Sequence, residues 1–194
     1  MISSNRSAGV FAALGLICVA LCGNVYAQST QPRIVGQVSN EQRITVQQSV
    51  PALVRRSQDK GRLSTDQKLG RMVLLIAPTA DQESAAAKLV ASQQDSSSPQ
   101  FHKWLTPAQY GDKFGVATND AQKVQQWLQS QGFGVNEVSQ SRRFVVFTGT
   151  VGQVETAFST QMHSYSLNKQ EFIANSTDIR IPAALAPVVK GVVR

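Results

Sequence analysis

Cysteine is nearly absent from this chain of 194 residues, and the positions of the few that occur narrow its chemistry. The two cysteines, Cys18 and Cys22, both lie in an apolar N-terminal stretch. The remainder of the chain therefore has no disulfide, no thiol nucleophile and no cysteine metal ligand. Its stability has to come from a hydrophobic core, and the chain is long enough to form one domain around such a core.

Histidine is equally scarce, with His102 and His163 as the two in the chain. Neither has a second histidine, a cysteine or a close acidic pair at ligand spacing, so the sequence predicts no metal site and no cofactor. The Gly-x-Ser-x-Gly elbow of serine hydrolases is also absent. A triad of serine, histidine and aspartate has no support from spacing, and we expect no catalytic residue in this chain.

The first residues have the pattern of a secretion signal. Arg6 supplies a positive charge, residues 10–21 are apolar, and residues 25–27 place small side chains where a signal peptidase reads them. The apolar run is shorter than the ~20 residues that a membrane-spanning helix needs. We expect cleavage after Ala27, export to the periplasm or the extracellular space, and no membrane attachment once the signal is removed.

Acidic residues are outnumbered, since 19 Lys and Arg against 12 Asp and Glu give a formal net charge of +7. The basic residues are scattered, and export argues against a nucleic-acid partner. Residues 143–147 resemble the aromatic strand of an RNA-binding domain, but they lack the glycine and second aromatic pair that stack bases. Two interpretations stay open, an acidic protein partner and a basic surface that merely keeps the chain soluble.

Hydrophobic patterning predicts a mixture of helices and strands over residues 44–180. Residues 28–43 are polar and predict a disordered lead-in. Residues 181–194 predict the start of an extended linker, because Pro182 and Pro187 oppose helix formation. Between these ends we expect strands at 72–77, 133–138, 143–148 and 162–167, with 171–173 completing a hairpin. Helices are expected at 81–95, at 119–131 (capped by Thr118) and after Thr150, which has capping-box spacing to Gln153.

The order of these elements is strand, helices, strand, strand, helix, strand. This order is typical of a ferredoxin-like split βαβ unit. We therefore predict an α+β fold, with an antiparallel sheet that carries helices packed on one face. Trp127 and Phe158 are expected in the core, on helices over that sheet.

Residues 97–115 carry the most distinctive motif, Ser-Ser-Pro-Gln-Phe-His-Lys-Trp-Leu-Thr-Pro-Ala-Gln-Tyr-Gly-Asp-Lys-Phe-Gly. Thr106, Pro107 and Gln109 occupy the cap, first position and capping-box position of a short helix. Further blocks follow, at 127–135, 143–150, 153–158, 163–165, 174–175 and 181–192. Their order and spacing resemble the pro-kumamolisin activation domain, the N-terminal propeptide of sedolisin-type serine-carboxyl peptidases, along roughly residues 50–193.

The resemblance implies the same fold and a role as intramolecular chaperone and inhibitor of a catalytic domain that follows the propeptide. Catalysis in that family needs a Glu and Asp pair and a Gly-Thr-Ser nucleophile region on the catalytic domain, which also holds the family's calcium. No Gly-Thr-Ser occurs in this sequence, so we expect the catalytic domain to be missing from this chain. The alternatives are a stand-alone exported inhibitor and an exported binding module unrelated to proteolysis.

A sedolisin-type catalytic domain is accordingly the expected partner. The motif contains four aromatic residues, Phe101, Trp104, Tyr110 and Phe114. The sequence does not show which of them lie in the core and which lie at an interface with this partner. The histidines also have two interpretations: a pH-dependent role at an interface, since the resemblance implies maturation in acid, or an ordinary surface position. The candidate interface residues are Phe101, His102, Trp104, Arg142, Arg143 and His163.

Overall fold

A computed structural model describes residues 30–193 of the protein. The expected cleavage after Ala27 and both cysteines lie outside these residues.

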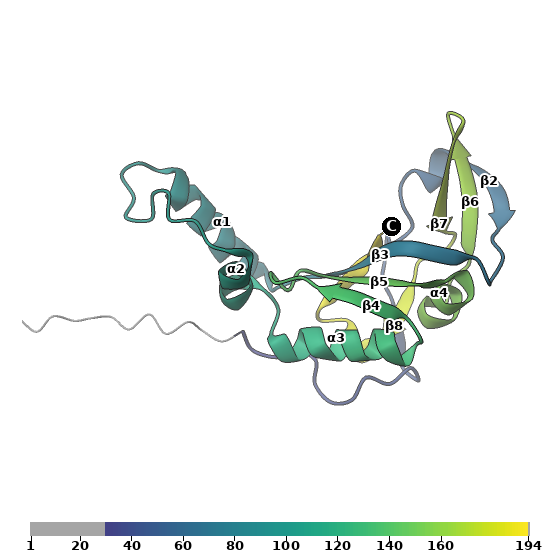
Figure 1. The fold of residues 1–194 in the computed structure, drawn as a ribbon, viewed down its shortest axis with the longest axis horizontal. Coiled ribbons are helices and arrows are strands. Elements are labelled where there is room, and N and C mark those ends of the chain that lie inside the picture. Colours follow the sequence, from purple (N-terminus) through teal and green to yellow (C-terminus); the bar gives the residue numbers. More distant parts are fainter. Residues whose placement is uncertain (1–29, 194) are drawn as a thin grey trace, which may run out of the picture.

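Four antiparallel strands form the central sheet, in the spatial order β4-β5-β3-β9 (Figure 1). Helices separate β3 from β4 and β5 from β9, as in a split βαβ unit, and this confirms the predicted α+β class. The sequence assigned the last strand of the unit to residues 162–167, whereas β9 takes that place in the sheet. The bounds are β3 (Lys68–Ile76), β4 (Gly134–Val138), β5 (Phe144–Thr150) and β9 (Val189–Val193).

The C-terminal segment belongs to the fold, so the expectation of a linker does not hold for residues 181–193. Ile181, Leu185 and Val188 are fully buried, and β9 pairs with β3 along one side of the sheet. The two prolines do keep the segment out of an α-helix, and it forms only the short 3-10 turn η2 (Ala183–Leu185). The segment is nevertheless buried, because its apolar side chains belong to the hydrophobic core at that edge of the sheet.

Helices α3 (Thr118–Ser130) and α4 (Val151–Phe158) cover one face of the central sheet. Trp127 and Phe158 are 4% and 0% exposed, which confirms their prediction as core residues. Their rings meet edge to face at 5.4 Å, and Phe158 also lies 6.4 Å from Phe147 of β5. Since one cluster joins both helices to the strands, the two helices pack on the same face.

Capping follows the sequence at most helix starts. The predicted capping boxes, Thr106 with Gln109 and Thr150 with Gln153, are both present. Thr118 does not cap α3, because the helix begins at Thr118 itself and its N-cap is Ala117, which has no side-chain hydrogen bond. At the N-terminal end of α3, the buried carboxylate of Asp120 accepts hydrogen bonds from the backbone of residues 33 and 34.

Residues 30–42 form a strap along α3, in contrast to the disorder expected for residues 28–43. Ile34 is 2% exposed, and its backbone N–H donates to Asp120 Oδ1 at 3.0 Å. The N–H of Arg33 donates to Asp120 Oδ2 at 2.7 Å, and Trp127 Nε1 donates to Asn40 Oδ1 at 3.1 Å. The polar composition hides this order, since few apolar side chains (Ile34 and the partly buried Val38) and hydrogen bonds to distant parts of the chain hold the strap.

Two smaller sheets complete the fold. One has the order β2-β6-β7, and contains the predicted hairpin at residues 162–173. The other pairs β1 with β8. Their bounds are β1 (Arg43–Thr45), β2 (Gln58–Arg62), β6 (Met162–Leu167), β7 (Gln170–Asn175) and β8 (Arg180–Pro182), and a 3-10 turn η1 (Val54–Arg56) precedes β2.

Helices α1 (Ala80–Gln94) and α2 (Pro107–Phe114) do not lie on the sheet. They pack against each other and project from the end of β3, with the connecting loop at the far tip (Figure 1). We call this unit the arm, residues 80–114. The prediction of helices on one face therefore applies to α3 and α4, while the arm is a protrusion.

Candidate partner interface

The face of the central sheet opposite the helices carries a group of apolar side chains. Val73 of β3 faces Val193 of β9, and Leu75 faces Phe144 of β5, so these four side chains lie on the face opposite the core. Leu75 is 39% exposed and Val193 48%, while Val73 and Phe144 are half-buried. The alternate residues of β3 that face the helices are at most 2% exposed. We call the four residues Val73, Leu75, Phe144 and Val193 the open face.

The aromatic residues of the motif divide between the arm's interior and its tip. Phe114 is 4% exposed and Tyr110 is half-buried, and their rings lie 5.3 Å apart inside the arm. Phe101 and Trp104 lie on the tip loop and are 37% and 61% exposed. Two of the four rings thus stabilise the arm, and the other two face solvent.

The tip loop is held in a defined shape by Gln93, a buried side chain at the end of α1. The backbone N–H of His102 donates to the carbonyl of Gln93 at 3.0 Å, and the Gln93 amide donates to the carbonyl of Lys103. His102 has a φ of 55°, a conformation that costs a non-glycine residue stability. Its ring stacks on Phe101 at 3.7 Å and lies 5.8 Å from Trp104.

Arg142, a candidate interface residue, fixes the base of the arm instead. It lies in the turn between β4 and β5, and its side chain is 14% exposed. Its guanidinium donates to the carbonyl of Val116 at 2.7 Å, to the carbonyl of Gly111, and to Asp112 Oδ1 at 2.9 Å. The neighbouring Arg143 lies 3.4 Å from Glu83 of α1 and adds a second link.

Glycine at two positions lets the arm approach this turn. A Cβ on Gly115 would lie 2.5 Å from the carbonyl oxygen of Ser141, and one on Gly111 would overlap the carbonyl of Gln140. Backbone therefore packs directly on backbone where the arm meets the sheet. The arm is a rigid extension of the β4–β5 hairpin as a result.

His163 lies away from the arm, in the three-stranded sheet. Its Nδ1 is 3.0 Å and 2.9 Å from the two carboxylate oxygens of Asp59 on β2, and its Nε2 is buried with no hydrogen-bond partner in the described part of the chain. A hydrogen bond from the N–H of Gly61, with a smaller effect of His163, lowers the pKa of Asp59. The candidate residues therefore occupy three places, the arm's tip, the arm's base and this sheet.

An ion pair between Arg62 and Glu155 joins β2 to α4 beside His163. Arg62 donates to both oxygens of Glu155, at 3.1 Å and 2.5 Å, and Glu155 also accepts the N–H of Met162 at 2.9 Å. Glu155 is only 9% exposed. The hydrogen bond from Arg62, followed by that from Met162, lowers the pKa of the Glu155 carboxyl group. Sequence reasoning missed this pair because Arg62 and Glu155 lie far apart in the chain.

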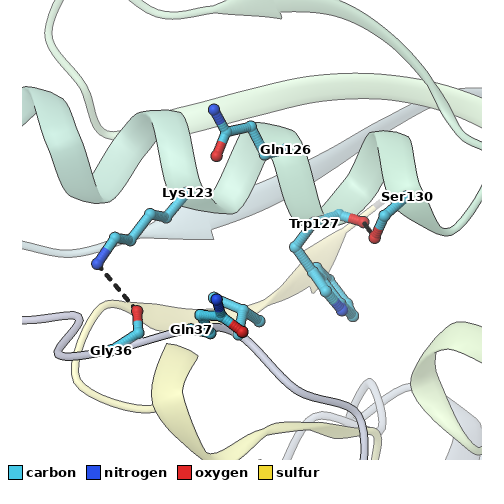
Figure 2. A pocket seen from close by; sticks show the side chains of 7 residues that line it. Gly36, Gln37, Lys123, Gln126, Trp127 and Ser130 are labelled. Carbon is cyan, nitrogen blue, oxygen red and sulfur yellow. Dashed lines mark hydrogen bonds between the residues drawn. The ribbon is translucent and has the colours of Figure 1, made fainter.

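One open cavity of about 360 Å³ lies between the strap and α3 (Figure 2). Lys123 points into it from α3, but its ammonium already donates to the carbonyls of Ile34 at 2.8 Å and Gly36 at 3.1 Å. The remaining lining is Gln37, Val38, Gln126, Trp127 and Ser130. Apart from the apolar Val38, these side chains carry amide, indole and hydroxyl groups and no pair of titratable groups. We therefore interpret the cavity as a gap in the packing of the strap on α3 and not as a catalytic site.

Residues 30–193 contain neither a metal-binding cluster nor a membrane-spanning helix. Within them, no three His, Cys, Asp or Glu side chains are grouped closely enough to hold a metal ion. None of the helices over the same residues has the length and apolar character to span a bilayer.

Exposed apolar surface on the open face and exposed rings on the arm's tip are features of domains that dock on other proteins. Residues 55–194 match the model of the family described as pro-kumamolisin, activation domain. This match covers more than half of the chain, and the chain belongs to that family.

Curated relatives of the chain are proteins of the sedolisin family. The chain is 35% identical to xanthomonalisin of Xanthomonas sp. (strain T-22) over 92 residues, 47% of this chain and 11% of that protein. It is 27% identical to sedolisin of Pseudomonas sp. (strain 101) over 110 residues, 57% of this chain and 19% of that protein. Kumamolisin of Bacillus sp. (strain MN-32) is 21% identical over 134 residues, 69% of this chain and 24% of that protein. The chain thus spans no more than about a quarter of these relatives' length.

Proposed function

We propose that this chain is the activation propeptide of an exported sedolisin-type serine peptidase, and that it acts as folding template and inhibitor of the catalytic domain. Family membership and the short span of the match within much longer relatives support the propeptide role. The observation that carries the docking role is the open face, where Leu75 of the inner strand β3 and Val193 of the edge strand β9 expose apolar side chains.

The catalytic domain is the occupant that fits this face. The relatives contain several times more chain than the segment matched here, so in them a large further body adjoins the propeptide. Covering the open face would remove Leu75 and its neighbours from water, at about 25 cal/mol per Å² of apolar surface. A preformed antiparallel sheet also offers a template for a large domain whose own folding is slow.

Inhibition in trans tests this function. The purified chain lacking residues 1–27 should inhibit the mature catalytic domain of xanthomonalisin and should accelerate its refolding from denaturant. Leu75→Glu should lose both effects, because it places a charge in the middle of the docked face. Leu53→Glu is the matched control, since Leu53 is 46% exposed on the η1 segment, and it should behave as the wild type.

Three results would contradict parts of this proposal. Failure of the wild-type chain to inhibit any sedolisin-type peptidase would remove the functional assignment. Equal inhibition by the Leu75 and Leu53 variants would show that the open face is not the docking surface. Hydrolysis of a denatured protein by the purified chain alone would contradict the expected lack of catalytic residues.

A further inference from the structure

The tip of the arm holds a cluster of aromatic rings that the fold does not use. Trp104 is 61% exposed and Phe101 is 37% exposed. His102 lies between them in the sequence, and its ring stacks on Phe101 at 3.7 Å and lies 5.8 Å from the ring of Trp104. Single exposed apolar side chains are common on proteins. Three adjacent rings at the end of a projecting arm form a patch, and tryptophan is the residue most enriched among the anchors of protein interfaces.

The tip is organised before any partner binds. Gln93 holds the loop through two backbone contacts, and the capping box of Thr106 and Gln109 fixes the start of α2 immediately after the rings. The left-handed backbone of His102 is part of this arrangement and costs stability. A loop fixed in its binding shape loses little entropy on association, so the strain has a use if the rings bind a partner.

The position of the arm determines what the tip can reach. Figure 1 shows α1 and its tip loop rising on the side of the central sheet opposite to α3, which is the side of the open face. The β2-β6-β7 sheet rises on the same side at the other end, and the C-terminal end of the chain lies between them. A globular body on the open face would therefore have the arm along its flank.

We propose that the arm's tip is a second docking site, at which Trp104 and Phe101 enter an apolar depression on the flank of the catalytic domain. This inference rests on the proposed function and adds a second, separate contact to it. Lys103 is exposed between the two rings, so the depression should carry a carboxylate at its rim. Arg142 and the close packing at Gly115 act as positioning elements, because they hold the arm at a fixed angle to the open face.

The test measures affinity for the catalytic domain of xanthomonalisin with its active site blocked, by titration calorimetry at neutral pH. Trp104→Ala should weaken binding by roughly 30-fold or more, as expected for an interface anchor. Leu53→Ala, which removes a similarly exposed apolar side chain elsewhere, should leave the affinity unchanged. Both variants should melt within about a degree of the wild type, since neither side chain supports the core.

Phe101→Ala guards against a folding defect in the Trp104 variant, because it removes the other exposed ring of the tip and leaves Trp104 in place. Weaker binding by both variants with unchanged melting supports the proposal. Wild-type affinity in the Trp104 variant, with Leu75→Glu still defective, would overturn the arm site and leave the proposed function intact. Absence of wild-type binding would defeat both, and concentration-dependent self-association that Trp104→Ala abolishes would assign the tip to a second copy of this chain instead.

Discussion

Replacing Phe158 by alanine should remove the side chain on which the central core depends most. Phe158 ends α4 and is fully buried. Its ring contacts three others, Trp127 at 5.4 Å, Phe133 at 6.0 Å and Phe147 at 6.4 Å. It thereby links both helices that cover the sheet to the sheet itself.

The expected loss follows from the size of the cavity and the aromatic contacts. Truncating a buried phenylalanine to alanine costs about 3–5 kcal/mol. The edge-to-face contact with Trp127 is itself worth about 0.5–1.5 kcal/mol, so the upper part of that range is expected. Domains of this size are stable by about 5–15 kcal/mol, so the variant should lose about a third of its stability at the upper end of this range and most of it at the lower end.

Urea unfolding followed by circular dichroism measures this loss, with Phe101→Ala as the matched control. Phe101 undergoes the same chemical change, but its side chain is exposed at the arm's tip, so its free energy of unfolding should shift by less than about 0.5 kcal/mol. The midpoint of Phe158→Ala should fall while the slope stays constant. A loss below about 1.5 kcal/mol would show that the two helices are not anchored through this ring.

Three further perturbations address the strap, the arm and the ion pair of Glu155. Asp120→Ala should cost about 1–3 kcal/mol of unfolding free energy, because it leaves the N–H groups of the strap without their acceptor, and proteolysis near residue 34 should accelerate; unchanged proteolysis would argue against the strap. Gly115→Ala should destabilise the arm by about 1–3 kcal/mol, since its Cβ meets backbone that cannot yield, and amide exchange in α2 should rise while that of α4 stays constant. Because the pKa of Glu155 is lowered in the fold, its ionised carboxylate stabilises the protein at every pH above 4.5, the ordinary pKa of this group. This contribution is lost as the pH falls through the folded-state pKa. Glu155→Gln should accordingly show a shallower fall of stability between neutral pH and pH ~3 than the wild type, and parallel curves would refute this linkage.

The sequence predicts the local elements well because their signals are local. Capping boxes at Thr106 and Thr150 and the apolar spacing around Trp127 depend on neighbouring residues, and the structure has each of them. The prediction that Thr118 caps α3 is wrong, because residue 118 is already the first residue of the helix. The polar side chain that is buried at this helix end is Asp120, which accepts the N–H of Ile34.

Long-range pairing is what the sequence does not reveal. β9 lies next to β3 because its apolar residues fit a vacant sheet edge, and no local pattern separates such a strand from an extended linker. Among the candidate interface residues, Phe101 and Trp104 are both exposed. Arg142, in contrast, donates hydrogen bonds to the backbone carbonyls of Gly111 and Val116. Composition gives no means of telling a free arginine from one that is occupied by backbone.

The pairing of β9 with β3 also governs the order of events during synthesis. β3 occurs in the first half of the chain and its partner is the last strand described, so one edge of the central sheet stays unfinished until almost the whole chain has emerged from the ribosome. Contacts that close such a long stretch of chain form slowly, and exposed strand edges invite aggregation in the interval. Until β9 has been synthesised, the longest strand, β3, therefore has β5 on one side and an unpaired edge on the other.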